Sequence, residues 1–378
     1  MHAAGATLEL SDHSRDVASH LHGVQHIVFV LADGLGIEMV DQMPRRSWIR
    51  QHTRRAIHAP FPTTTTTAVT SITTAAFASQ HAVAGWWVHL PELDGPATVF
   101  AHDRAVDGRS LHDLGVGIKA LCPAPRIFGQ LTHDALLLVP AGIVDSTYTE
   151  HMADGRSRIG YRHYGEAIET ILRHIDEANG PTFTYWYTAS PDSEAHDEGS
   201  RGSRVGRALE VLDDALSTLA SGLRDRTDSW RIVGTADHGH LDLEPHLEIA
   251  EHDPILAFLK YPPAGDMRVQ YWHVRDGSHD AFVAHFQERF GKDFYLLTAA
   301  EVEELALFGP GPWSAPMRER SGDFISLSRG SAALRYAGIP GRGGYQRMRS
   351  GHSGMTPSEM LIPLIIGGED VEPAAYDQ

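Results

Sequence analysis

The sequence is poor in cysteine, in positive charge and in long apolar runs, and each deficit limits what the protein can be. A single cysteine, Cys122, stands among 378 residues, so no disulfide can form within the chain. The first 22 residues are polar and lack the apolar core of a secretory signal. Runs such as Ile27–Ala32 are far too short to span a bilayer. We therefore expect a cytoplasmic protein with no membrane partner.

The charge balance argues against a general binder of polyanions. Lysine and arginine number 32 against 49 aspartates and glutamates, which gives a formal net charge of −17. A nucleic-acid duplex or an anionic membrane surface would repel such a chain. Small anionic substrates remain compatible with it, because bound cations can reverse the local field.

Short β-branched or aromatic runs alternate with helical patterns, which is typical of an α/β sheet with helices on both faces. The helical patterns at Gly165–Asn179 and Val205–Leu223 place apolar residues three and four positions apart. Four runs are interpreted as buried parallel strands: His26–Ala32, Thr182–Tyr187, Arg231–Thr235 and Met360–Ile366.

The segment 245–349 has a different residue pattern from the rest of the chain. It combines a strand-like run at Arg268–Arg275 with a helix at His279–Phe290 and a capping box formed by Thr298 and Glu301. We interpret it as a smaller inserted cap subdomain. Residues 23–244 and 350–370 would then form the catalytic α/β core, with residues 1–22 as an N-terminal extension.

Acidic and imidazole side chains recur just after predicted strands, at the edge where open α/β sheets bind ligands. Asp33 precedes a Gly-rich turn, where a lone aspartate more often serves as a turn or cap residue. Asp192 and His196 are four residues apart, so one helical turn would place them on the same face as half of a zinc site. The alternative for this pair is a helix-start aspartate beside a surface histidine.

Four further candidates lie later in the chain, three of them just after the predicted strand Arg231–Thr235. Asp237 and His238 are adjacent, and at a turn both can converge on one ion, while His240 is a third ligand or a pocket residue. His352 is flanked by glycines that would let the backbone approach a metal. With His240 taken as a pocket residue, the three aspartates and three histidines offer three ligands to each of two divalent ions. Oxygen and imidazole ligands favour catalytic Zn²⁺, with Mn²⁺ as the alternative, whereas a structural zinc site would use cysteines.

Five threonines at positions 63–67 open a helical pattern, which is more than capping requires. A hydroxyl at a helix N-terminus is well placed to attack phosphorus, because the helix amides and dipole favour a nearby anion. A base or a metal must first remove its proton.

The order Asp, Thr, Asp-x-x-x-His, Asp-His, His resembles the alkaline phosphatase superfamily and, within it, the type I phosphodiesterase and nucleotide pyrophosphatase family. The motifs FPTTTTTAVTS, PDSEAHDEG, ADHG and GHSG-xxx-E-M carry the resemblance, which runs from about His26 to Gly367. It implies an alkaline-phosphatase-like three-layer sandwich around a mostly parallel sheet. It also implies two zinc sites, one on Asp33, Asp237 and His238 and the other on Asp192, His196 and His352.

The resemblance further implies a nucleophile that follows Phe-Pro after two intervening residues. This register selects Thr65, with Thr64 or Thr66 as alternatives, and aligns His81 with a histidine that the family often shows after this helix.

Two positions depart from the family pattern. Some members carry an asparagine that holds a phosphoryl oxygen where this chain has Ala68, so backbone amides or another donor must replace it. The glycine that usually follows the helix is Ala75.

The implied function is hydrolysis of phosphodiester or pyrophosphate bonds in a small nucleotide-like substrate through a phosphothreonine intermediate. Trp86 and Trp87 could line an aromatic slot for the second substituent of a diester, or could simply pack. Tyr185 and Trp186 are better explained as core residues of a strand. A basic patch that could meet a second phosphate, or form a solvated loop, consists of Arg156, Arg158 and Arg162.

Other functions stay open. A phosphomonoesterase or a phosphonate hydrolase would use the same ligands, and an inactive metal-binding interaction protein is the alternative from another class. A sulfatase is disfavoured, because the segment Cys122–Arg126 lacks the required proline spacing and lies far from the nucleophile position.

Overall fold

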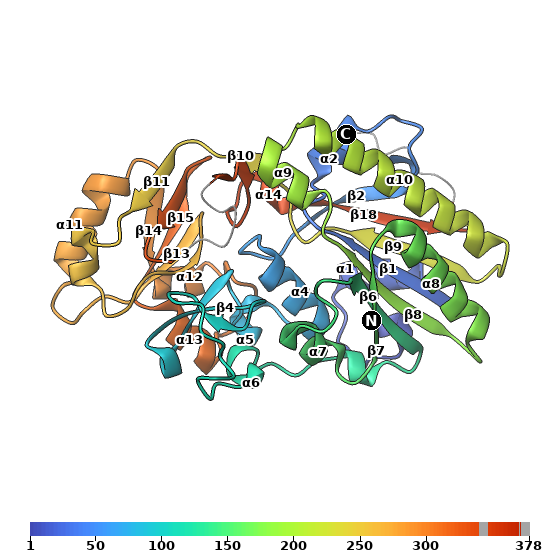
Figure 1. Ribbon diagram of the computed structural model, residues 1–378, viewed down its shortest axis with the longest axis horizontal. Helices are drawn as coiled ribbons and strands as arrows, with labels where there is room; N and C mark the ends of the chain where they lie inside the picture. Colours follow the sequence, from blue (N-terminus) through green and yellow to red (C-terminus); the bar gives the residue numbers. More distant parts are fainter. Residues whose placement is uncertain (340–346, 370, 372–378) are drawn as a thin grey trace. The chain divides into compact units, whose positions relative to one another are not determined.

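The computed structural model describes residues 1–339, 347–369 and 371, and the chain groups into two compact units (Figure 1). Unit 1 comprises residues 1–58, 126–239 and the segment from residue 361 onward. Unit 2 comprises residues 59–125 and 240–360. The segment 59–125 therefore groups with 240–360. The predicted assignment of 23–244 and 350–370 to a catalytic core, and of 245–349 to a cap, stays a prediction about roles, and residues 340–346 and 370 lie outside the described part.

Unit 1 is built on a seven-stranded sheet of order β2-β18-β9-β1-β8-β6-β7. β1 pairs in parallel with β8 and β9, and β6 pairs in parallel with β7 and β8. This confirms the α/β fold with a mostly parallel central sheet. Its strands are β1 (His26–Ala32), β2 (Thr53–His58), β6 (Asp134–Pro140), β7 (Ser157–Tyr161), β8 (Thr182–Thr188), β9 (Trp230–Thr235) and β18 (Leu361–Gly368).

The fourth predicted parallel strand, Met360–Ile366, is wrong in its direction. The strand observed there, β18, runs antiparallel to both β2 and β9. An apolar run encodes burial on both faces of a sheet but not the direction of the strand.

Side chains of β8 alternate between helices on the two faces of this sheet. The ring of Trp186 contacts Tyr164 of α8 at 5.7 Å, and the ring of Tyr185 contacts Phe128 of η3, also at 5.7 Å. Both Tyr185 and Trp186 are buried, which confirms their prediction as core residues. The helices of unit 1 are α1 (Asp12–Ser19), α2 (Ile37–Gln42), α3 (Trp48–His52), α7 (Thr147–Ala153), α8 (Tyr164–Glu177), α9 (Asp192–Glu198) and α10 (Ser203–Arg224), with 3₁₀ turns η1 (His2–Ala4) and η3 (Phe128–Gln130).

Unit 2 contains a second seven-stranded sheet, of order β14-β15-β13-β12-β3-β4-β5, in which every pairing is antiparallel. Its strands are β3 (Trp87–Leu90), β4 (Gly95–Thr98), β5 (Asp103–Arg104), β12 (Ala264–Asp266), β13 (Val269–Trp272), β14 (Phe294–Thr298) and β15 (Phe324–Ser328). The sequence indicated only β13. The other strands have two to five residues each, too few for an apolar period to stand out.

Two short ladders and seven helices complete the described part of unit 2. The predicted capping box is present, since the Thr298 side chain accepts from Glu301 N and the Glu301 side chain accepts from Thr298 N. The ladders are β10 (Leu241–Asp242) with β17 (Ser350–Gly351) and β11 (His246–Ile249) with β16 (Ala333–Tyr336). The helices are α4 (Thr65–Thr74), α5 (Ala78–His81), α6 (Ile118–Leu121), α11 (His279–Phe290), α12 (Ala299–Glu304), α13 (Ala315–Ser321) and α14 (Pro357–Met360), with 3₁₀ turns η2 (Pro91–Leu93) and η4 (Pro254–Phe258).

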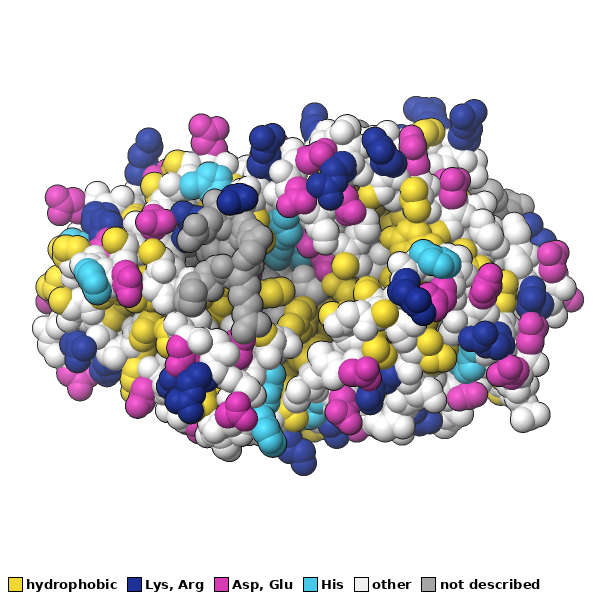
Figure 2. Space-filling model, viewed as in Figure 1, with side chains coloured by type: hydrophobic (Ala, Val, Ile, Leu, Met, Phe, Trp, Pro, Cys, Tyr) yellow, Lys and Arg dark blue, Asp and Glu magenta, His cyan; other side chains and the backbone are white. Residues whose placement is uncertain are grey.

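The surface is mixed in charge. Figure 2 shows acidic side chains in magenta and basic side chains in dark blue interspersed over the visible face. The excess of acid in the composition is therefore spread over this face rather than gathered in one region. Among the described residues, no helix has both the length and the apolar character needed to cross a membrane.

Candidate active site

Three neighbouring strands of unit 1 deliver the acidic candidates to one edge of the sheet. Asp33 directly follows β1, Asp192 opens α9 after β8, and Asp237 and His238 follow β9. Since β8, β1 and β9 are adjacent and parallel, their carboxyl ends meet at the same edge. The backbone N–H of Asp192 donates to the carbonyl of Asp33 at 3.0 Å and joins two of these loops directly.

Asp33, Asp237 and His238 form a buried cluster with ligand atoms within 4.8 Å of one another. Nε2 of His238 lies 3.4 Å from Oδ1 of Asp33 and 3.4 Å from Oδ2 of Asp237. Both carboxylate oxygens are buried, and neither takes part in a hydrogen bond within the described residues. Buried polar atoms normally have hydrogen-bond partners, so two carboxylate oxygens that lack them beside an imidazole nitrogen fit a divalent cation.

The other polar atoms of this cluster are held by fixed partners. Oδ2 of Asp33 accepts from the Tyr187 hydroxyl at 2.5 Å, and Oδ1 of Asp237 accepts from the backbone N–H groups of Gly34 and His238. Nδ1 of His238 lies 3.1 Å from the carbonyl of Gly239. A proton on Nδ1 donates to that carbonyl and leaves the Nε2 lone pair facing the carboxylates, as in a metal-binding histidine.

Tyr187 was missed by the sequence analysis. It is the next-to-last residue of β8, and its only signal is this position at the ligand-binding end of a strand, which many packing tyrosines share. Burial and the charges of Asp33 and Asp237 raise its pKa well above the usual value, so its hydroxyl stays a donor to Asp33.

The cluster concentrates negative charge. Burial, followed by the charges of Asp237 and Asp192, raises the pKa of Asp33 well above its usual value. Carboxylates gathered in this way are stabilised when a cation lies among them.

The second predicted pair lies beside this cluster, on α9. Nε2 of His196 lies 3.2 Å from Oδ1 of Asp192, so the four-residue spacing places both groups on one face of the helix, as expected. The two side chains are about one seventh exposed, at 14% and 15%. The pair is thus accessible enough to take up an ion and close enough to bind it together.

The threonine run belongs to unit 2, where α4 begins at Thr65 with Thr64 as its N-cap. The hydroxyl of Thr64 donates to Oδ2 of Asp266 at 2.9 Å, and that of Thr66 donates to the carbonyl of Gly85 at 2.8 Å. Both alternatives to Thr65 therefore have hydroxyl protons bound to acceptors within the unit. Thr65 itself occupies the first position of the helix and is 4% exposed.

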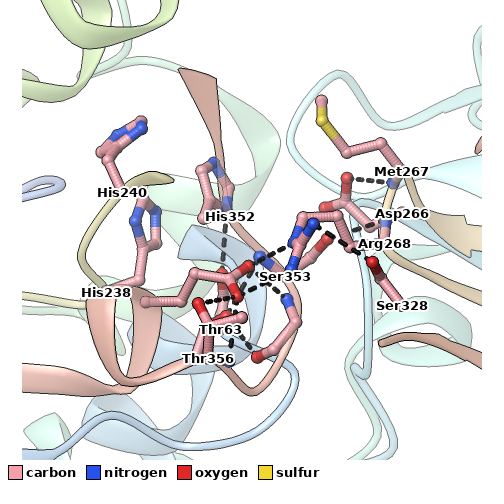
Figure 3. A network of polar contacts seen from close by, with 12 residues as sticks. Thr63, His238, His240, Asp266, Met267, Arg268, Ser328, His352, Ser353 and Thr356 are labelled. Carbon is pink, nitrogen blue, oxygen red and sulfur yellow. Dashed lines mark hydrogen bonds and ion pairs between the residues drawn. The ribbon is translucent and has the colours of Figure 1, made fainter. Parts of the chain in front are cut away.

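His352 lies on the same unit and is held by Thr63, which precedes α4. Its Nδ1 lies 2.8 Å from the carbonyl of Thr63, which directs Nε2 away from that bond (Figure 3). The ring of His240 meets the His352 ring at 5.4 Å and 81°, and its Nδ1 lies 3.1 Å from Oγ of Ser350. His240 is two residues beyond His238 in the chain.

Five of the seven predicted ligand and nucleophile residues thus lie in unit 1, and Thr65 and His352 lie in unit 2. The predicted aromatic residues are also in unit 2 and are half-buried. Trp86 packs edge-to-face on Phe100 at 5.4 Å, and Trp87 opens β3.

His81 braces the helix that carries Thr65. Its Nδ1 accepts from the Val83 backbone N–H, which leaves Nε2 to donate to Oγ of Ser71 on α4, 2.9 Å away. Burial, and then the charge of Arg320, lowers its pKa to about 3, so the ring is neutral. The left-handed residue that ends α4 is Ala75, with φ 51°, at the position where the family usually has glycine.

One arginine of the predicted basic patch has a structural role in unit 1. Arg156 donates to the carbonyls of Phe128, Gly129 and Leu131 and so closes the turn before β6. Arg162 is exposed, with Nε 3.8 Å from Glu166. Arg158 lies on the edge strand β7.

Comparison with solved structures supports the fold. A human ectonucleotide pyrophosphatase/phosphodiesterase 5 matches with a TM-score of 0.66 at 14% identity, over 92% of this chain and 89% of that chain. An inactive murine form of the same protein in complex with AMP matches with a TM-score of 0.65 at 14% identity, over 91% and 88% of the two chains. Identities this low establish the fold alone.

Sequence comparison identifies the family. Ectonucleotide pyrophosphatase/phosphodiesterase family member 3 of Rattus norvegicus is 35% identical over 89 residues, 21% of this chain and 10% of that protein. The protein of the same name from Bos taurus is 35% identical over 80 residues, 20% and 9% of the two chains. The chain thus matches about a tenth of the length of these relatives. Residues 27–329, most of the sequence, match the family described as type I phosphodiesterase / nucleotide pyrophosphatase, and the chain belongs to that family.

Proposed function

We propose that the protein is a metal-dependent phosphodiesterase or nucleotide pyrophosphatase that acts on small nucleotide-like substrates. The observation that carries the proposal is the buried cluster of Asp33, Asp237 and His238, in which two carboxylate oxygens without hydrogen bonds face one imidazole nitrogen. This donor set is suited to a catalytic divalent ion, in a chain whose family consists of phosphate-ester hydrolases.

Two ions would be held by six side chains. The first ion is assigned to Asp33, Asp237 and His238, and the second to Asp192, His196 and His352, with zinc preferred and manganese as the alternative. When bound, such ions neutralise the phosphoryl oxygens and make a hydroxyl easier to deprotonate. His352 is assigned to the second ion from its place in the GHSG motif, which carries the resemblance to the family.

Thr65 is assigned as the nucleophile. Its Oγ1 forms a bond to phosphorus while the bond from phosphorus to the leaving oxygen breaks, and water then hydrolyses the resulting phosphothreonine. Its place as the first residue of α4, directly after the N-cap Thr64, supports this choice over its neighbours. An inactive variant of the murine relative has a threonine replaced by alanine, which also supports a threonine nucleophile.

Backbone amides at the start of α4 can hold the phosphoryl oxygen that an asparagine holds in some relatives. The first hydrogen bond of the helix runs from Ala68 N to Thr64 O. The amides before it in the first turn are not used by the helix, and such amides bind anions.

The nucleotide preference is supported by the AMP bound to the murine relative. In this chain the Trp86–Phe100 pair offers an aromatic surface on the unit that carries Thr65, and Thr66 bonds to the residue just before Trp86. Trp86→Ala should therefore raise KM for a nucleotide ester several-fold, while KM for a small diester changes little. Steady-state kinetics on the two substrates measures this difference.

Turnover assays test the proposal. Bis-p-nitrophenyl phosphate, p-nitrophenyl phosphate and a nucleotide p-nitrophenyl ester are each supplied with and without a chelator, and then with added Zn²⁺ or Mn²⁺. We expect the two diesters to be cleaved faster than the monoester, with loss on chelation and recovery with metal. A preference for the monoester would make the protein a phosphomonoesterase, and no turnover of any substrate would favour an inactive metal-binding protein. The cytoplasmic location stays a prediction, which cell fractionation can check.

A further inference from the structure

The short loop that carries His352 is bonded to the residue two positions before Thr65. Nδ1 of His352 donates to the carbonyl of Thr63 at 2.8 Å, and the backbone N–H of Ser353 donates to the same carbonyl at 2.8 Å (Figure 3). The Thr63 hydroxyl donates to the carbonyl of Gly354 at 2.8 Å and accepts from Ser353 N at 3.0 Å. The candidate metal ligand and the start of the nucleophile helix are therefore one hydrogen-bonded assembly within unit 2.

A fully buried ion pair holds the other side of this loop. Nε of Arg268 lies 2.6 Å from Oε1 of Glu359, Nη2 lies 3.0 Å from Oε2, and both side chains are 0% exposed. The remaining donors of Arg268 reach Oγ of Ser328 and the carbonyls of Gly330 and Ala332. All three nitrogens of the guanidinium therefore donate hydrogen bonds, as a buried charge requires.

Both members of the pair also bond to the loop itself. Glu359 accepts from Gly354 N at 2.7 Å, from Thr356 N at 3.0 Å and from the Thr356 hydroxyl at 2.6 Å. The backbone N–H of Arg268 donates to Oγ of Ser353 at 3.2 Å. The loop is thus clamped between the ion pair and Thr63.

The backbone of the loop is shaped by this clamp. Ser353 has φ 90°, a conformation that costs a non-glycine residue energy and persists only when its surroundings hold it. At Gly354 an added Cβ would lie 2.8 Å from Arg268 Nη2 and 2.8 Å from Glu359 Oε2, so a side chain there would displace the pair. The conformation of Ser353 and Gly354 is therefore set by their contacts with Arg268 and Glu359.

We infer that Arg268 and Glu359 are positioning residues, which fix the Nε2 direction of His352 and the start of α4 through the loop 352–354 and Thr63. The inference rests on the proposed function for the roles of His352 and Thr65. Neither residue of the pair touches substrate or metal. Partners that orient a metal-binding histidine commonly change metal affinity by roughly 10- to 100-fold when they are removed.

Zinc affinity separates this role from simple stabilisation. Zn²⁺ titration of the metal-free protein, in competition with a chromogenic chelator, measures the two ions separately. Arg268→Met and Glu359→Gln should weaken the ion assigned to Asp192, His196 and His352 about 10- to 100-fold. The ion assigned to Asp33, Asp237 and His238 should keep the wild-type affinity, since none of its ligands is on the loop.

The double variant Arg268→Met/Glu359→Leu tests whether the pair only stabilises unit 2. Removing one partner leaves an unpaired buried charge, whereas replacing both by apolar residues removes that penalty. The double variant should therefore melt at a higher temperature than either single variant, yet its affinity for the second zinc should stay low. Recovery of zinc affinity together with thermal stability would overturn the inference, as would an equal weakening of both ions.

Arg320→Met is the matched control. Arg320 is also a buried arginine of unit 2, at 5% exposure, but its guanidinium donates to the carbonyls of Ala82, Ala120 and Leu121 and not to the loop. It should lower the melting temperature and leave both zinc affinities unchanged. Loss of the second zinc in this control would also count against a specific role for Arg268. If the wild type binds two zinc ions but cleaves no phosphate ester, the proposed function fails while the zinc titrations still decide the inference.

Discussion

The imidazole of His238 directs Nε2 at Oδ1 of Asp33, 3.4 Å away, although the two residues follow different strands. β1 and β9 are neighbours in the sheet of unit 1, so the pair exists only because the fold brings their ends together. The oxygen of Asp33 in this contact takes part in no hydrogen bond within the described residues, and burial together with Asp237 and Asp192 raises the pKa of this carboxyl. The carboxylates of Asp33, Asp237 and Asp192 are consequently unfavourable as bare charges and favourable around a cation.

Asp33→Asn should act in opposite directions with and without metal. In the metal-free protein near neutral pH, the charge of Asp33 opposes folding, and each unit by which its pKa is raised corresponds to about 1.4 kcal/mol. Asparagine keeps the shape without the charge, so the metal-free variant should melt at a higher temperature than the wild type. With saturating Zn²⁺ the order should reverse, because one ligand is lost. Thermal melts under both conditions measure this, and a variant destabilised equally in both would refute the metal role.

Thr65→Val should abolish turnover while zinc binding changes little. Valine fills the volume of threonine but has no hydroxyl to attack phosphorus. Thr64→Val and Thr66→Val are matched controls on either side, and each leaves a buried acceptor without its hydroxyl donor, at Asp266 or Gly85. Loss of that bond should lower the free energy of unfolding by roughly 1–3 kcal/mol. Both controls should keep most of the turnover, and activity that survives in Thr65→Val but not in Thr64→Val would move the nucleophile to Thr64.

The sequence predicted well what local pattern encodes. The strand His26–Ala32 and the helix His279–Phe290 match the observed bounds, because each is a run whose period is visible without a partner. The short strands of the second sheet in unit 2 were missed, since two to five residues carry too little period. The predicted direction of β18 was wrong because the burial of a strand does not determine its direction.

Contacts between distant segments account for what the sequence did not indicate at the site. Arg268 and Glu359 are separated by 91 positions, and neither stands in a motif that marks an ion pair. Tyr187 looks like any aromatic residue of a strand until its hydroxyl is seen on Asp33. Residue types and spacing identified the candidate ligands, but the groups that orient those ligands could be recognised only from the fold.

Tyr187→Phe should weaken the zinc ion assigned to Asp33 by roughly 10-fold or more. The hydroxyl that it removes fixes Oδ2 of Asp33 and thereby the direction of Oδ1, and partners of ligands affect metal affinity on this scale. Zn²⁺ titration against a competing chelator measures the effect.

Tyr185→Phe is its control on the same strand, two residues away. The Tyr185 hydroxyl is buried and takes part in no hydrogen bond within the described residues, so its removal should leave zinc affinity unchanged and raise the free energy of unfolding by about 1 kcal/mol. Equal zinc affinities in the two variants would show that Tyr187 only packs.

His81 should make the protein sensitive to acid in a defined pH window. Burial lowers its pKa to about 3 in the folded state, whereas an unfolded histidine has a pKa of about 6.5. Between these values the unfolded chain binds a proton that the folded chain does not. The stabilising effect of a neutral His81 is therefore complete above pH 6.5 and falls by about 1.4 kcal/mol for each pH unit below it, until the pH reaches about 3.

His81→Asn isolates this contribution. Asparagine can accept from Val83 N through its side-chain oxygen but does not titrate. Between pH 6 and pH 4 the free energy of unfolding of the variant should therefore fall less steeply than that of the wild type, by about 1.4 kcal/mol per pH unit. Urea unfolding at a series of pH values, with the chelated protein to keep metal ligands out of the comparison, measures the slope. Parallel slopes for the two proteins would mean that His81 is already protonated in the fold, and that Nδ1 is not the acceptor for Val83.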